Sequence, residues 1–353
     1  MRTMHGGDWA GFQREYGSLP LDFSANLNPL GMPEGVRRAA ATAAENADRY
    51  PDPECFRLRQ ALSACHHIPA EQIVCGNGAA DLIFRLPLAL KPKTALLPVP
   101  VFTEYETALQ GAGCEVRRFP LSEENDFALT EAILPHIVPG LDLLILCNPN
   151  NPTGRTAETS LLRQILERCR QTGTRRVVDE CFIEMLDRPE KHSLVSRLSE
   201  ETDLILIRAF TKSFSMAGLR LGYALCGDSV TAARLQDCGQ AWAVSGPAQA
   251  AGLAALRETA YLDQVRALLE IERPFLTEGL KELGCRCIQG EANFILFHSE
   301  DMALCEKLRQ RGILLRDCRD FEGLQPGWYR CAIRTHEENA LFLQAMEGVL
   351  VHG

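Results

Sequence analysis

Residues 141–154 read Leu-Asp-Leu-Leu-Ile-Leu-Cys-Asn-Pro-Asn-Asn-Pro-Thr-Gly, a short apolar run that ends in a turn rich in asparagine and proline. Residues 159–171 then follow a helical pattern, and a second apolar run begins at Arg175. Two strands that are apolar on both faces, joined by a helix, are typical of a right-handed βαβ unit in a parallel sheet. This stretch therefore predicts an α/β fold.

The same alternation extends in both directions from this unit. Helical patterns at 79–90, 103–113 and 129–136 lie between short β-type runs. Helices that alternate with strands are expected to cover both faces of the sheet. The pattern predicts a large domain with a mostly parallel seven-stranded sheet, whose strands we place at 72–75, 94–98, 115–119, 142–147, 175–178, 203–209 and 222–226.

The chain divides into three parts by pattern. Residues 49–246 carry the strand and helix alternation and form the expected large domain. Residues 247–353 begin almost entirely helical and continue as an α+β pattern, which predicts a smaller C-terminal domain. Residues 1–48 do not fit the βαβ pattern and are punctuated by Asn28-Pro29-Leu30-Gly31, so we expect an N-terminal arm that packs with the small domain.

Composition excludes several classes of function. The 353 residues include 37 Lys and Arg against 46 Asp and Glu, a net charge of −9, which argues against a nucleic-acid or membrane-surface partner. No signal peptide or apolar run of about 18 residues is apparent, so we expect a cytoplasmic protein with no membrane span. The 14 cysteines are scattered without a Cys-x-x-Cys pair, and the histidines lack metal-binding spacing. We expect free, mostly buried thiols and no metal.

Lys212 is the first candidate for chemistry. It follows an apolar strand, within Arg208-Ala-Phe-Thr-Lys-Ser-Phe-Ser-Met-Ala-Gly-Leu-Arg220, and we place it in a small polar turn. A solvated surface lysine is the ordinary alternative. Thr211 and the permanent cation Arg220 favour a different interpretation, because a lysine partly buried beside another cation has the lowered pKa that Schiff-base chemistry needs.

Three other stretches place polar groups where strands end. Asp179 ends the run Val177-Val178-Asp179, at the edge where open α/β sheets bind ligands, although a plain turn aspartate is the alternative. The stiff turn 148–154 can hold an amide at a fixed point. Residues 76–81, Gly-Asn-Gly-Ala-Ala-Asp, would offer free N–H groups to a phosphate at a helix start, but they match neither nucleotide-binding fingerprint.

Taken together and in this order, these motifs resemble the fold-type I pyridoxal-phosphate enzymes, the aspartate aminotransferase-like family. The resemblance covers essentially the whole chain. Within the family, the chain is most similar to the branch that holds the threonine-phosphate decarboxylases of cobalamin synthesis and, next, the histidinol-phosphate aminotransferases.

The resemblance implies a role for each motif residue. Lys212 is expected to bind pyridoxal 5'-phosphate covalently, and Asp179 to pair with the pyridine nitrogen so that the ring can act as an electron sink. Asn151 is expected to bond the phenolic oxygen, and Phe102 to stack on the ring. The resemblance assigns the cofactor phosphate to Gly78, Ala79, Ala80, Thr211 and Arg220, and to Tyr50 from the other subunit of a homodimer.

The same branch implies a small phosphorylated amino acid as substrate. A carboxylate and a phosphate together need more than one arginine. Arg330 matches the carboxylate-binding arginine of the family, and Arg316 adds a cation. Arg334, four residues on, is expected to lie on the same strand face as Arg330, with a surface ion pair as the alternative. The expected substrate contacts are His5, Asn26, Asn151, Arg316, Arg330 and Arg334.

Two reactions stay open at this level. Decarboxylation of L-threonine O-3-phosphate is favoured by the N-terminal His5-Gly6-Gly7, by residues 315–324 and by Phe182, where the aminotransferases usually have tyrosine. Serine phosphate is a second substrate under this hypothesis. The alternative is a histidinol-phosphate or related aminotransferase. Ala209 departs from both patterns, because a hydroxyl that would hold the cofactor phosphate is usual there.

Overall fold

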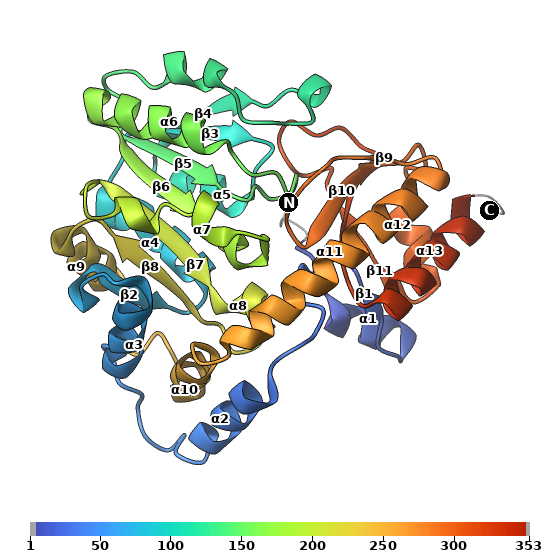
Figure 1. Ribbon diagram of the computed structural model, residues 1–353, viewed down its shortest axis with the longest axis horizontal. Coiled ribbons are helices and arrows are strands. Elements are labelled where there is room, and N and C mark those ends of the chain that lie inside the picture. The colour runs from blue at the N-terminus through green and yellow to red at the C-terminus, as the bar shows by residue number, and fades with distance from the viewer. Residues whose placement is uncertain (1–4, 351–353) are drawn as a thin grey trace.

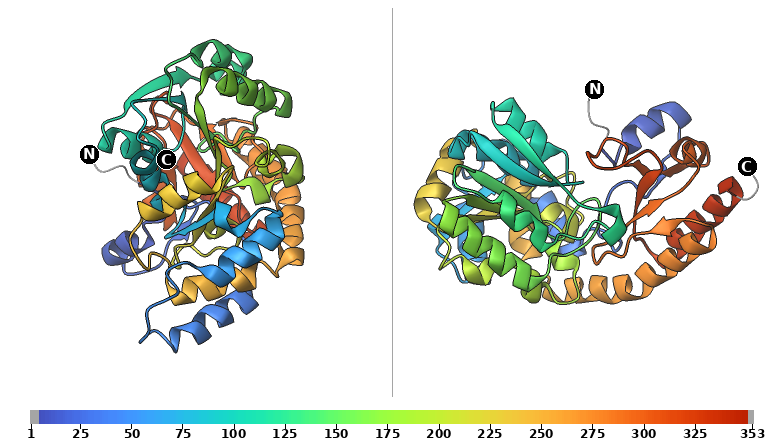
Figure 2. Two further views of the ribbon diagram at one scale, coloured as in Figure 1. Left: turned by 90° about the vertical axis from the view of Figure 1, so that its left-hand side faces the viewer. Right: turned by 90° about the horizontal axis from the view of Figure 1, so that it is seen from above.

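A computed structural model describes residues 5–350 of the chain. It has two lobes joined by the long helix α11 (Thr259–Glu282), which runs along one side of both (Figures 1 and 2). The larger lobe contains a seven-stranded sheet in the order β2-β8-β7-β6-β5-β3-β4. Its strands are β2 (Ile73–Gly76), β3 (Thr94–Val99), β4 (Glu115–Pro120), β5 (Leu143–Cys147), β6 (Arg175–Asp179), β7 (Leu204–Ala209) and β8 (Gly222–Cys226).

The sheet confirms the fold class expected from the sequence. Strands β3 to β7 are mutually parallel, and only β8 runs antiparallel to its neighbours β2 and β7. Each of the seven strands lies within one residue of its predicted bounds. Continuous apolar runs are accurate signals here because both faces of each central strand are buried, as along β5, where Leu144 and Ile145 face opposite hydrophobic clusters.

Helices cover both faces of this sheet (Figure 1). An amphipathic pattern explains α6, whose buried Leu162, Ile165 and Cys169 share one face before Gly173 ends the helix. The helices α4 (Ala79–Leu90), α5 (Glu104–Gly111) and α9 (Ser229–Asp237) pack on one face, and α3 (Phe56–His66), α6 (Thr159–Thr172) and α10 (Gly246–Ala255) pack on the other.

The smaller lobe is an antiparallel sheet covered by helices. Its strands lie in the order β12 (Arg316–Asp317), β13 (Trp328–Ala332), β10 (Phe294–His298) and β9 (Arg286–Cys287). Helices α11, α12 (Leu304–Gln310) and α13 (His336–Leu350) enclose a separate hydrophobic cluster with the sheet. The second lobe therefore has a core of its own.

The N-terminal segment connects to both lobes. After α1 (Trp9–Tyr16), strand β1 (Leu21–Asp22) pairs in parallel with β11 (Ile313–Leu314) of the smaller lobe. Helix α2 (Glu34–Ala44) instead packs against α10, at the lower end of Figure 1. The three-part division at residues 48 and 246 stays a prediction, and residues 1–4 and 351–353 of its outer parts lie outside the described residues.

Three local predictions are wrong. Residues 129–136 form a 3₁₀ segment, Glu131–His136, instead of an α-helix, because Pro135 removes a backbone donor from so short a stretch. Lys212 lies on a one-turn helix, α8 (Phe210–Ser213), instead of in a turn. Strand β13 ends at Ala332, short of Arg334. The short elements that remain are α7 (Pro189–His192) and 3₁₀ segments at Ala70–Gln72, Glu123–Asn125, Ile183–Met185 and Val195–Arg197.

The cysteines, the metal-ligating residue types and the helices bear on the expectations of free thiols, no metal and no membrane span. All 14 cysteines are free thiols, most of them buried. Within residues 5–350, no group of three or more His, Cys, Asp or Glu side chains is arranged to hold a metal ion. Over the same residues, every helix is too short or too polar to cross a lipid bilayer.

Candidate active site

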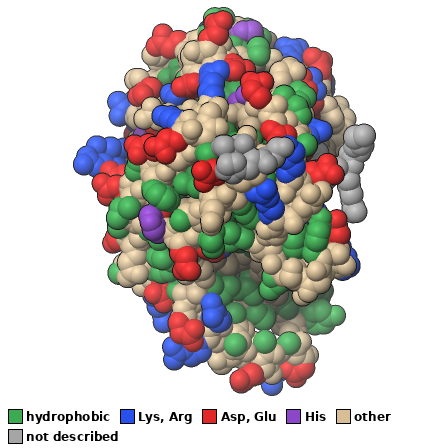
Figure 3. All heavy atoms as spheres, turned by 90° about the vertical axis from the view of Figure 1, so that its right-hand side faces the viewer, with side chains coloured by type: hydrophobic (Ala, Val, Ile, Leu, Met, Phe, Trp, Pro, Cys, Tyr) green, Lys and Arg blue, Asp and Glu red, His purple; other side chains and the backbone are tan. Residues whose placement is uncertain are grey.

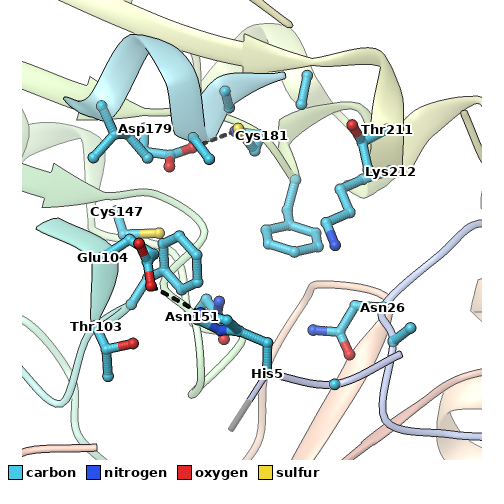
Figure 4. A pocket seen from close by; sticks show the side chains of 18 of the residues that line it. His5, Asn26, Thr103, Glu104, Cys147, Asn151, Asp179, Cys181, Thr211 and Lys212 are labelled. Atoms are coloured by element: carbon cyan, nitrogen blue, oxygen red, sulfur yellow. Dashed lines mark hydrogen bonds and ion pairs between the residues drawn. The ribbon is translucent and has the colours of Figure 1, made fainter. Parts of the chain in front are cut away.

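A cavity of about 380 Å³ lies where the carboxyl ends of the central parallel strands meet the smaller lobe and the N-terminal segment. In Figure 4, the Lys212 amine points into the space bounded by Asp179, Asn151 and Asn26. The side chains come from distant parts of the sequence. The lining includes His5, Asn26, Ala79, Ala80, Phe102, Asn151, Asp179, Thr211, Lys212, Arg220, Arg316 and Arg330, all of which the sequence analysis named.

Lys212 is placed for nucleophilic and proton-transfer chemistry. Helix α8 follows the buried strand β7 directly, so the lysine lies at the strand end. Burial lowers the pKa of Lys212 to about 8, and the positive charges of Arg330 and Arg220 act in the same direction. Its Nζ lies 5.6 Å from the centroid of the Phe182 ring. A larger share of this amine than of an ordinary lysine is therefore neutral, and hence nucleophilic, near neutral pH.

Asp179 is the last residue of β6, and both of its carboxylate oxygens are hydrogen-bonded. The backbone N–H of Cys181 donates to Oδ1 at 2.8 Å, and the Tyr105 hydroxyl donates to Oδ2 at 2.5 Å. Burial raises the pKa of Asp179, whereas the hydrogen bonds from Cys181 and Tyr105 lower it. Such bonds favour the charged carboxylate in a site that excludes water.

Asn151 and Arg330 form a linked pair across the two lobes. The Arg330 Nη1 donates to Asn151 Oδ1, and its Nη2 donates to the Ser24 carbonyl at 3.0 Å. The turn that carries Asn151, residues 148–154, is closed by a hydrogen bond in which Gly154 N donates to the Asn150 carbonyl at 2.7 Å. Since its oxygen is used by Arg330, the Asn151 amide group presents its N–H donors as the available hydrogen-bonding groups.

A cradle for an anion lies at the start of α4. Gly78 precedes the first helical residue, Ala79, and has φ +81°, a conformation that favours glycine. A Cβ built on Gly78 would lie 2.7 Å from Nη2 of Arg220, so the guanidinium lies directly against this backbone. Arg220 also holds a left-handed backbone, φ +58°. Helix N–H groups and a guanidinium together suit a phosphate.

The N-terminal segment closes another side of the cavity. A Cβ on Gly6 would lie 2.1 Å from the Ser24 carbonyl oxygen, so only glycine allows this close approach. His5 Nε2 lies 2.8 Å from Glu104 Oε1 on the large lobe, a contact drawn in Figure 4. Asn26 is buried, and its Oδ1 has no hydrogen-bond partner within residues 5–350. An orphaned buried oxygen at a cavity wall marks a place where a ligand donor fits.

Three predicted site residues are not part of the cavity lining: Gly78, which directly precedes the lining residue Ala79, Arg334 and Tyr50. Arg334 donates to the Asp22 carbonyl and pairs with Glu338 at 2.6 Å. The expectation that it shares a strand face with Arg330 is wrong, because the strand ends before it and alternation no longer applies. Tyr50 is 80% exposed and stacks on Trp242 with ring centroids 4.4 Å apart. Its expected role across a subunit interface stays a prediction.

Sequence reasoning missed several residues of this site. Tyr105, Glu104, Thr103, Cys147 and Cys181 all line the cavity but were not proposed to have a role there. One signal was available: Tyr105 follows Phe102 by three residues at a helix start, a spacing that puts two side chains on the same helix face. The contact with Glu104 had no such signal, because His5 lies 99 positions away.

The residues fit pyridoxal 5'-phosphate. The donor set consists of a buried amine of lowered pKa, a buried carboxylate and an aromatic ring, with a glycine and arginine cradle for a phosphate. When bound, this cofactor supplies an electron sink for a bond broken at Cα of an amino acid. Lys212 would hold it covalently, Asp179 would face its ring nitrogen, and Gly78 with Arg220 would bind its phosphate. Fold and site thus define a pyridoxal-phosphate enzyme.

Comparison with known proteins gives the family. The model of the aminotransferase class I and II family matches residues 20–346, and the chain belongs to this family. It is 38% identical to the threonine-phosphate decarboxylase of Salmonella typhimurium, over 99% of this chain and 97% of the relative. It is 35% identical to the histidinol-phosphate aminotransferase of Symbiobacterium thermophilum, over 97% and 94% of the two chains.

A solved structure agrees with this assignment. The histidinol-phosphate aminotransferase from Clostridium acetobutylicum superposes with a TM-score of 0.87 at 29% identity, covering 94% of this chain and 99% of that one. The α/β fold with a second lobe is therefore the fold of a solved histidinol-phosphate aminotransferase.

Proposed function

We propose that the protein decarboxylates L-threonine O-3-phosphate to CO2 and (R)-1-amino-2-propanol O-2-phosphate with pyridoxal 5'-phosphate, as a step of cobalamin biosynthesis. L-Serine O-phosphate is a second substrate under this proposal. The observation that carries it is the pair Arg316 and Arg330, which line the same cavity as Lys212. The Arg316 Nη2 also donates to the Asp320 carboxylate at 2.8 Å. Two guanidinium groups match two anionic groups, a carboxylate and a phosphate. Similarity to the Salmonella typhimurium decarboxylase supports the same substrate.

The chain's own residues would divide the work as follows. Arg330 binds the substrate carboxylate; burial lowers its pKa to about 10, so it remains charged at neutral pH. Arg316, His5 and the side-chain N–H groups of Asn26 bind the substrate phosphate, whose oxygens accept hydrogen bonds. Loss of CO2 leaves an electron pair on Cα, and the Lys212 amine is placed to deliver a proton to that carbon. Asp179 would pair with the ring nitrogen of the bound cofactor and favour its protonated form.

The runner-up is transamination of histidinol phosphate, which the 35% identity to a histidinol-phosphate aminotransferase favours. Histidinol phosphate carries a phosphate but no carboxylate, so it would use only one of the two arginines. The resemblance also leads us to expect a tyrosine hydroxyl at position 182 in an aminotransferase, and this chain has Phe182 there. Its ring instead packs edge-on against Phe294, with centroids 5.0 Å apart. The missing hydroxyl at Phe182 supports decarboxylation. The two arginines do not discriminate, because the amino-acid partner of a transamination would bring a carboxylate to Arg330.

The proposal includes a homodimer in which Tyr50 reaches the cofactor phosphate of the partner subunit. Tyr50, Phe56 and Trp242 are large, exposed apolar side chains, which are enriched at protein interfaces. In Figure 3, hydrophobic side chains gather in a hollow above the lower end of the molecule, where α2 lies. A second copy seated there would cover this face. We also propose a cytoplasmic location, because 14 free cysteines suit a reducing compartment.

The test is CO2 release in the absence of any keto acid acceptor. Purified protein with pyridoxal 5'-phosphate is incubated with a panel of threonine phosphate, serine phosphate, threonine and histidinol phosphate. We expect CO2 from threonine phosphate, less or none from unphosphorylated threonine, and none from the Lys212→Ala variant. Turnover that requires 2-oxoglutarate and produces glutamate would establish the aminotransferase instead.

A further inference from the structure

The Tyr105 hydroxyl makes the shortest hydrogen bond to Asp179 that the structure records. The two oxygens of the Asp179 carboxylate have different partners: a backbone N–H holds Oδ1, and Tyr105 holds Oδ2 at 2.5 Å. Tyr105 is 0% exposed and Asp179 is 5% exposed. A charge-assisted hydrogen bond in so dry a place is stronger than one in water, and its loss leaves a buried charge short of a partner.

The fold leaves this phenol little freedom to move. Tyr105 lies in the first turn of α5 and belongs to the hydrophobic cluster between α4, α5 and the sheet. Its ring meets that of Phe102 edge to face, with centroids 5.6 Å apart at 85°. The start of α5 therefore places Phe102 at the cavity and the Tyr105 hydroxyl against the Asp179 carboxylate. Packing fixes both at once.

The proton of this bond stays on Tyr105. Burial raises the pKa of the Tyr105 hydroxyl well above its usual range, and the Asp179 charge raises it further. The phenol is therefore the donor and the Asp179 carboxylate the acceptor of this bond. The titratable groups that face Asp179 are Tyr105 on α5, Cys147 on β5, Cys181 after β6 and Lys212 on α8.

We propose that Tyr105 is a positioning residue that holds the Asp179 carboxylate charged and aimed at the cofactor's ring nitrogen. The inference rests on the proposed use of pyridoxal 5'-phosphate. By donating to Oδ2, Tyr105 favours the ionised carboxylate against the effect of burial. Without the hydroxyl, Asp179 takes up a proton more readily and loses its attraction for a protonated ring nitrogen.

The experiment compares Tyr105→Phe with Tyr223→Phe. Tyr223 is another buried tyrosine of the large lobe, with its hydroxyl 3.0 Å from His66, away from the cavity. Cofactor-free protein is titrated with pyridoxal 5'-phosphate and followed by absorbance, and bound cofactor is then released by lowering the pH. For Tyr105→Phe we expect affinity on the order of tenfold weaker and release at a higher pH than in the wild type. Tyr223→Phe should match the wild type in both.

Two further variants separate positioning from simple packing. In an Asp179→Asn background, Tyr105→Phe should cause no further loss of cofactor affinity, because the charge on which it acts is gone. Tyr105→3-fluorotyrosine keeps the ring and makes a stronger donor, so it should move the release to a lower pH. Wild-type affinity and release pH in Tyr105→Phe would overturn this inference, and so would an equal loss in the Asp179→Asn background. A wild-type protein that binds no pyridoxal 5'-phosphate would overturn the proposed function as well.

Discussion

At the scale of single residues, the chemistry depends on the charge state of Lys212. An ordinary lysine is almost wholly protonated at neutral pH and is a poor nucleophile. Burial against Phe182, with Arg330 and Arg220 nearby, brings the pKa of Lys212 to about 8. At pH 7 roughly a tenth of the amine is then neutral. The aspartate and cysteine neighbours act in the opposite direction, which keeps the proton available for return to the substrate.

The first prediction concerns the pH dependence of cofactor uptake. A lowered pKa means that the neutral, reactive form of Lys212 increases as the pH rises through about 8. The rate at which cofactor-free protein takes up pyridoxal 5'-phosphate should rise over the same interval and level off above it. Stopped-flow absorbance measures this rate. A rate that is flat from pH 6 to pH 9 would contradict the lowered pKa.

The second prediction compares two arginines of the smaller lobe. Each is paired with a carboxylate, Arg316 with Asp320 at 2.8 Å and Arg334 with Glu338 at 2.6 Å, but only Arg316 lines the cavity. Arg316→Ala should weaken binding of threonine phosphate by about 1.5–3 kcal/mol, the usual cost of a lost charge-assisted hydrogen bond. Arg334→Ala should leave that affinity within twofold and lower only the melting temperature. Calorimetric titration of both variants checks this, and equal losses would restore Arg334 to the site.

At the scale of elements, the helices and strands that a local residue pattern determines could be predicted from the sequence. The seven strands of the large lobe are buried on both faces, so continuous apolar runs located them to within a residue. The anion cradle followed from Gly-Asn-Gly between a strand and a helix. The prediction at 129–136 did not hold, because six residues with an internal proline close only a 3₁₀ segment. Arg334 was misplaced for a similar reason: no local signal shows where a strand stops.

The third prediction tests the start of α4. Gly78→Ala puts a Cβ 2.7 Å from the Arg220 guanidinium and strains a backbone at φ +81°. Cofactor affinity should fall, because the arginine must leave the phosphate cradle. Gly173→Ala is the matched control, since Gly173 has φ +73° at the end of α6 with no atom within 4 Å of an added Cβ. Gly173→Ala should lose about 1 kcal/mol of stability, and Gly78→Ala about 1–3 kcal/mol, because φ +81° with ψ 165° is a region that essentially only glycine adopts. Only Gly78→Ala should bind less cofactor.

At the scale of the whole molecule, the site exists because distant segments meet. His5, Lys212 and Arg330 come from the N-terminal segment, the larger lobe and the smaller lobe, and they line one cavity. The motif residues could be assigned one by one through the family resemblance. The contacts between them could not, because the bond from Tyr105 to Asp179 spans 74 positions and that from Arg330 to Asn151 spans 179. Pairings at that separation are set by tertiary packing, which leaves no local trace in the sequence.

The fourth prediction concerns assembly. Under the proposal, each active site takes Lys212 from one subunit and Tyr50 from the other. Tyr50→Ala and Lys212→Ala therefore remove residues that different subunits contribute to one site. Coexpression of the two variants should give hybrid dimers with one intact site, and activity well above that of either variant alone. A coexpressed sample that is no more active than either variant alone would contradict the proposal. Sedimentation analysis of the wild type should also give twice the chain mass of 39.1 kDa.

The central claim is that Lys212 and the cations of this cavity direct the loss of CO2 and not the transfer of the amino group. The most direct measurement follows the α-nitrogen and the α-carbon of ¹⁵N-labelled threonine phosphate turned over in D2O. We predict an amino-alcohol phosphate that keeps its ¹⁵N and gains one solvent deuterium at the carbon that lost the carboxylate. Label recovered in glutamate, with the substrate's carboxylate intact, would contradict the account.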